Sequence, residues 1–76
     1  QMGLAEEIFL ESIRLARAQQ ARFFELKSAL GLANLWASQN MSRQARLLLS
    51  DILNQMTEGF EVPVVKAASQ FISNLS

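Results

Sequence analysis

Hydrophobic residues recur at every third or fourth position through most of this chain, the spacing that places them on one face of an α-helix. In LAEEIFLESIRLARA, residues 4–18, apolar side chains cover about half of the helical circumference, and glutamates and arginines fill the other half. The stretches FFELKSALGLANLWASQ (23–39), RQARLLLSDILNQM (43–56) and VVKAASQFISNL (64–75) repeat this pattern. The sequence therefore predicts an all-α chain with no strand, whose helices lie near residues 3–19, 22–39, 42–57 and 63–75 and pack as consecutive antiparallel neighbours.

The first of these helices is apolar over more of its surface than one neighbouring helix can cover. Its hydrophobic side chains fall into two sets: Leu4, Ile8 and Leu15 form one, and Phe9, Ile13 and Ala16 form the other. We expect one set to face the second helix and the other to be left open. The isolated chain is therefore expected to form a homo-oligomer, because a symmetric dimer is the commonest way to cover such a strip.

The second helix contains a glycine and a tryptophan that indicate how it packs. Gly31 costs a helix about 1 kcal/mol relative to alanine, which suggests that another helix comes close to it. Trp36 lies on the apolar face, and we expect it to be largely buried against the first or the third helix. Ala33 and Ala45 are expected at the closest approach between helices, because small side chains let two backbones come together.

Asn40 and Ser42 separate the second and third helical stretches. Asparagine tolerates the left-handed conformation that ends many helices, so Asn40 is predicted to adopt it. Serine is a favoured N-cap, so Ser42 is predicted to cap the third helix.

The segment QMTEGFEVPVV, residues 55–65, predicts a corner between the third and fourth helices. Gly59 is predicted to end the third helix in the left-handed conformation, with Phe60 folded back on Leu53 or Met56. Pro63 suits the first turn of the fourth helix, where a missing N–H does no harm.

The composition excludes several classes of function for a chain of this kind. The 76 residues include 7 basic and 7 acidic side chains, and this balance argues against a dedicated nucleic-acid or anionic-membrane surface. No apolar run approaches the roughly 20 residues of a membrane helix. The chain has no cysteine and no histidine, so a thiolate metal site, a disulfide and the commonest general base are all missing. We expect neither an enzyme nor a cofactor, and the first residue, Gln1, suggests a fragment of a larger protein.

A shift of 40 positions aligns the chain with itself. The shift pairs apolar positions of the first helix with those of the third, and of the second helix with those of the fourth, and it also pairs Asn34 with Asn74. A period of about 20–50 residues is typical of solenoid proteins, in which each unit buries its apolar face on the next. Chance similarity between amphipathic helices is the alternative reading of this match.

Residues 29–52, ALGLANLWASQNMSRQARLLLSDI, resemble a tetratricopeptide repeat. Leu32 and Ala33 stand at the Leu-Gly positions of the repeat, and Trp36 stands at its large aromatic position. Asn40 stands at the turn glycine, Ala45 at the small residue of the second helix and Leu49 at the aromatic of that helix. The resemblance implies one domain over residues 1–76, an α-solenoid fragment of about four helices built from antiparallel hairpins.

The wider sequence is similar to the C-terminal repeats of large bacterial predicted ATPases, which often carry an adenylate/guanylate cyclase domain or a transcription-regulator domain upstream. The segment TEGF at 57–60, followed by Pro63, carries most of this similarity. The chain departs from the pattern at Val62 and Val64, where the family usually has a polar capping residue and an acidic residue. The resemblance implies a cytoplasmic, non-catalytic interaction module whose partner is a protein, a peptide or the host's own upstream domains.

The resemblance to a tetratricopeptide repeat also implies a concave groove. Its lining would come from Lys27, Leu30, Asn34, Ser38, Gln70 and Asn74. Repeats that clamp a C-terminal carboxylate place a lysine one turn before the groove asparagine, where this chain has Leu30 and Gln70, so such a clamp is not expected. A stand-alone, self-associating helical bundle with a structural role is the alternative function.

Overall fold

Four α-helices make up the computed structural model, which describes residues 2–75 and contains no strand in that range. They are α1 (Met2–Ala18), α2 (Arg22–Ala37), α3 (Ser42–Asn54) and α4 (Pro63–Leu75). The all-α prediction is confirmed, and every predicted helix end lies within three residues of the observed one.

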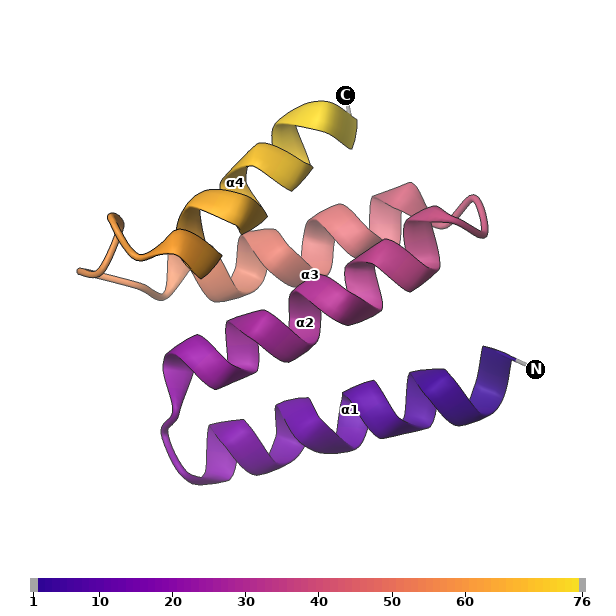
Figure 1. Ribbon diagram of the computed structural model, residues 1–76, viewed down its shortest axis with the longest axis horizontal. Helices are drawn as coiled ribbons and strands as arrows, with labels where there is room; N and C mark the ends of the chain where they lie inside the picture. The colour runs from indigo at the N-terminus through magenta and orange to yellow at the C-terminus, as the bar shows by residue number, and fades with distance from the viewer. Residues whose placement is uncertain (1, 76) are drawn as a thin grey trace.

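The helices are arranged as a row of antiparallel hairpins (Figure 1). Helix α2 contacts α1, α3 and α4, and α3 also contacts α4. Within residues 2–75, α1 contacts neither α3 nor α4. The chain therefore has a flat shape, with extents of 35 × 30 × 17 Å, and α1 lies at one end of it.

Helix α2 supplies the centre of the hydrophobic core, because it is the helix with three neighbours. The fully buried apolar side chains of α2 and α3 are Leu26, Ala29, Leu32, Ala33, Ala45, Leu49 and Ile52. Helix α4 adds Val65 and Ala68, and α1 adds Ile13 and Ala16. Both predicted small residues, Ala33 and Ala45, are completely inaccessible to solvent.

The first two helices end in the same backbone arrangement. Gln20 and Asn40 both have positive φ, 57° and 65°, and the amide that follows each reaches back to a carbonyl five residues earlier. The Ala21 N–H donates to the Ala16 carbonyl at 2.8 Å, and the Met41 N–H donates to the Trp36 carbonyl at 2.9 Å. The left-handed conformation predicted for Asn40 is confirmed, whereas that of Gln20 was not predicted, because glutamine does not favour it.

The prediction that Ser42 caps α3 is wrong by one residue. Met41 is the N-cap and makes no side-chain capping hydrogen bond, and Ser42 is the first helical residue. The tight turn at Asn40 accounts for this, because it brings the Met41 carbonyl into position to accept the Ala45 N–H at 3.1 Å.

The segment between α3 and α4 is longer than predicted, because α3 ends at Asn54. Gly59 has the expected positive φ, 81°, but it lies five residues beyond the helix and does not terminate it. The ring of Phe23 fills the space beside this glycine, where an added Cβ would lie 2.7 Å from Cζ of Phe23. Phe60 is exposed and lines a hollow on α4 with Lys66, so the structure does not fold it back on α3 as predicted. Pro63 begins α4, as predicted.

Candidate interaction surfaces

Three of the six predicted groove residues follow the exposed face of α2, with Ser38 at the C-cap of the helix. Lys27, Asn34 and Ser38 are separated by seven and four positions, so they lie on one side of the helix, and all three are exposed. Asn34 donates from Nδ2 to the Leu30 carbonyl at 2.9 Å, and Ser38 donates from Oγ to the Leu35 carbonyl at 2.7 Å. The Lys27 ammonium group, the Asn34 carbonyl oxygen and its second amide N–H, and the Ser38 hydroxyl oxygen as an acceptor remain available to a ligand on this face.

The other three predicted groove residues are placed differently. Leu30 is half-buried and packs against the core, which leaves only part of its side chain for a partner. Gln70 and Asn74 are exposed on α4, and the Gln70 amide lies 3.4 Å from Oδ1 of Asn74. Gln70 lines the hollow beside Phe60, whereas Lys27 lines a different one, so these two residues belong to separate parts of the surface.

Two adjacent phenylalanines near the start of α2 extend the exposed apolar surface. Phe24 is 69% exposed and lines a hollow with Leu15 of α1, and Phe23 is 43% exposed. Both rings also lie beside Lys27 and Val64 of α4. The hydrophobic spacing does not single out Phe24, although the adjacent Phe23 gives a signal: neighbouring positions on a helix point about 100° apart and rarely share one buried face.

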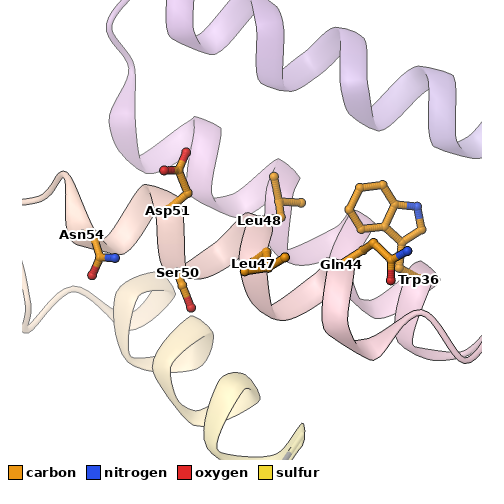
Figure 2. A pocket seen from close by; sticks show the side chains of 7 residues that line it. All are labelled: Trp36, Gln44, Leu47, Leu48, Ser50, Asp51 and Asn54. Atoms are coloured by element: carbon orange, nitrogen blue, oxygen red, sulfur yellow. The ribbon is translucent and has the colours of Figure 1, made fainter.

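A shallow hollow of about 590 Å³ runs along α3 beside Trp36 (Figure 2). Its lining residues are Trp36, Gln44, Leu47, Leu48, Ser50, Asp51 and Asn54. Trp36 is half-buried, less than predicted, because its ring borders this open hollow. Its indole N–H donates to Oε2 of Glu6 at 3.0 Å, which ties α2 to α1 as well.

Helix α1 presents the two apolar sets that the sequence predicts. Ile13 and Ala16 are buried, and Phe9 packs against the core. The other set is open to solvent: Leu4, Ile8 and Leu15 are 67%, 58% and 46% exposed. The expectation that one set faces α2 and the other is left uncovered is confirmed.

Two ion pairs involve the arginines of α1. Arg17 donates from Nε to Glu25 of α2, whose side chain is almost entirely buried. Arg14 pairs with Glu11 on the surface, and the hydrogen bond from Arg14 lowers the pKa of the Glu11 carboxyl below its ordinary value. The burial of Glu25 is not predictable from the sequence, since Glu25 and Arg17 come from different helices and no local pattern joins them.

Further chemical features of the described residues are few. No three side chains of the types His, Cys, Asp and Glu in the described part of the chain lie together as a metal site would require. None of the helices in that part combines the length and the apolar character needed to cross a membrane. Comparisons of the chain with protein-family models, with curated proteins and with solved structures found no match.

Proposed function

We propose that this chain is a non-catalytic helical-repeat module of the tetratricopeptide type, which binds a protein or peptide on the exposed faces of α2 and α4. The observation that supports it most is the pattern of helix contacts. Helices α2 and α4 touch, whereas α1 and α3 are in contact with α2 but not with each other in the described residues. In a repeat array each unit contacts only its neighbours, so α1 would belong to one unit, α2 and α3 to the next, and α4 to a third.

In this proposal α2 and α4 form the inner layer, and α1 and α3 the outer one. The inner layer would present Lys27, Asn34 and Ser38, with Asn74 at the matching position of α4. The residue types favour hydrogen bonds to a peptide backbone, and the exposed Phe24 adds an apolar contact of the kind that anchors binding. We further propose that the module is cytoplasmic and belongs to the C-terminal part of a bacterial signalling ATPase or cyclase-like regulator, so that any catalysis lies in other domains.

Selection from a library of random displayed peptides, followed by titration into isotope-labelled chain, tests the binding face. We expect the amide resonances of Lys27 and Asn34 to shift, and K27A and N34A to weaken binding at least about tenfold, since each would remove a hydrogen bond to the ligand. The matched controls are R43A and Q44A, which alter exposed residues of α3. Peptides whose binding depends on Gln44 instead, or failure to select any peptide, would overturn the proposal.

The second candidate is a self-associating helical bundle with a structural role. The exposed side chains of Leu4, Ile8 and Leu15 on α1 favour this candidate, because a second molecule that packs on them would remove three large apolar side chains from water. The length of the native open reading frame separates the candidates: a reading frame of about this length favours the bundle, and a much longer one favours the repeat module.

A further inference from the structure

One row of exposed apolar side chains runs along the outer side of α1, and its last member, Leu15, borders the hollow beside Phe24 of α2. Leu4, Ile8 and Leu15 lie four and seven positions apart, which places them on one face over about 16 Å of helix. They are among the most exposed large hydrophobic residues of the chain. No other helix among the described residues covers them, since α1 contacts α2 alone.

The charges beside this row are arranged in a definite order. Glutamates occupy positions 6, 7 and 11, and arginines occupy positions 14 and 17. Two of the five are engaged with α2, because Glu6 accepts from Trp36 and Arg17 pairs with Glu25.

Glu7, Glu11 and Arg14 remain beside the open row, and Glu11 is already paired with Arg14. Glu7 and Arg14 are seven residues apart and therefore lie on the same flank of the row. Glu7 makes no ion pair within residues 2–75. Arg14 donates from Nε and Nη2 to Glu11, which leaves its Nη1 for another acceptor.

We propose that α1 is a homodimer interface, at which it packs antiparallel to α1 of a second copy of this chain. A two-fold axis near residue 10 would place Leu4 against the partner's Leu15, with the two Ile8 side chains near the axis. The same reversal of direction brings Glu7 next to the partner's Arg14, and Arg14 next to the partner's Glu7. The interface is therefore complementary to itself, as a two-fold interface has to be.

The charges specify both the occupant and its direction. A parallel two-fold pairing would put the Glu7 and Arg14 flanks of the two copies on opposite sides of the interface, so neither charge would meet an opposite one across it. An anionic membrane surface would favour a helix whose polar flank is mainly Lys and Arg, whereas the charges beside this row are Glu7, Glu11 and Arg14. The contact of one helix pair falls below the size of a standard interface, so the dimer is expected to dissociate at concentrations on the order of micromolar. The two surfaces meet at the hollow that Leu15 shares with Phe24, but they are tested apart, the dimer by sedimentation and the binding face by peptide titration.

Sedimentation equilibrium of the full chain, from about 1 to about 200 μM, tests the proposal. We expect a monomer–dimer equilibrium that I8S weakens at least tenfold. The matched control is L47S, which changes a leucine on α3 with 60% exposure and should leave the dimer constant unchanged. Circular dichroism of each variant checks that the helices are intact.

Charge reversal tests the direction of pairing. E7R and R14E should each weaken the dimer, because each sets like charges against each other in the antiparallel arrangement. The double variant E7R/R14E restores both pairs and should return the dimer constant to within about threefold of the original. A chain that is monomeric over the whole range, equal effects of I8S and L47S, or charge variants that leave the constant unchanged would overturn the proposal.

Discussion

The ring of Phe9 on α1 occupies the space in which a side chain on Gly31 of α2 would lie. A Cβ built on this glycine comes within 2.5 Å of Cε1 and 2.9 Å of Cζ of Phe9. The close contact predicted from a glycine inside a helix is therefore confirmed, and its partner is an aromatic ring rather than another backbone. Gly31 allows α1 to pack on α2 with a large side chain between them.

Gly31→Ala should destabilise the fold by about 0.5–2 kcal/mol, because overpacking outweighs the gain in helix propensity. In a Phe9→Leu background, where the ring is gone, the same substitution should be neutral or stabilising. Gly3→Ala is the control, since nothing lies within 4 Å of a Cβ at Gly3. Urea unfolding of the unaltered chain, the two single variants at positions 9 and 31, and the double variant gives the coupling free energy between these positions. Additive effects of the two substitutions would contradict the contact.

The end of α1 contains a residue that is strained for its type. Gln20 has φ of 57°, a conformation that costs a residue with a Cβ about 1–2 kcal/mol. Gln20→Gly should therefore raise the free energy of unfolding by about 0.5–1 kcal/mol, after the entropy cost of glycine is subtracted. The control is Gln19→Gly, one residue earlier, where φ is not positive and glycine should destabilise. Thermal unfolding of the two variants measures this. A fall in melting temperature for both would show that the backbone at Gln20 is not strained.

The ion pair between Arg17 and Glu25 joins α1 to α2 near their connecting turn. Glu25 is buried while the Arg17 side chain is about half exposed, so removing the arginine leaves a buried carboxylate without its partner. Arg17→Met should cost about 1–3 kcal/mol of stability. Glu25→Gln in the same chain should recover part of that loss, because a neutral amide is easier to bury than an unpaired charge. Chemical denaturation of the unaltered chain and the two variants measures this, and a double variant less stable than Arg17→Met would count against the pair.

Much of the helical architecture was predictable from local features. The three-and-four spacing located all four helices, Pro63 marked the start of α4, and Asn40 marked the end of α2. The end of α3 was placed three residues too late, because Gly59 is held by Phe23 rather than by a helix terminus. The turn at Gln20 was missed since backbone hydrogen bonds, not residue type, fix its conformation.

The surfaces were less predictable than the helices. Periodicity could place Lys27, Asn34 and Ser38 on one exposed side, because that depends only on spacing within α2. It could not show which ring fills which space, so the half-buried position of Trp36 and the exposure of Phe24 emerge only from the packing. The spacing of a residue in the sequence predicts which face of its helix it lies on. Its burial depends on which side chains of the other helices pack against it.

The surface pair of Glu11 and Arg14 makes a prediction about pH. The hydrogen bond from Arg14, with a smaller contribution from its charge, lowers the pKa of Glu11 below the ordinary value of 4.5. A carboxyl whose pKa is lower in the folded helix than in the unfolded chain adds stability above the unfolded pKa, and this is lost as the pH falls through the folded pKa. The helix content of α1 should therefore decrease below about pH 4.5.

An NMR titration of the Glu11 side-chain carboxyl measures this directly. In Arg14→Gln the pKa of Glu11 should rise toward its ordinary value, whereas Arg46→Gln, which alters an exposed arginine of α3, should leave it unchanged. Added salt should shrink the difference, because both groups are exposed and salt screens exposed charges. The titration belongs in an Ile8→Ser background, where Arg14 cannot also meet the partner's Glu7. A Glu11 pKa that stays the same after Arg14→Gln would show that the pair does not form in solution.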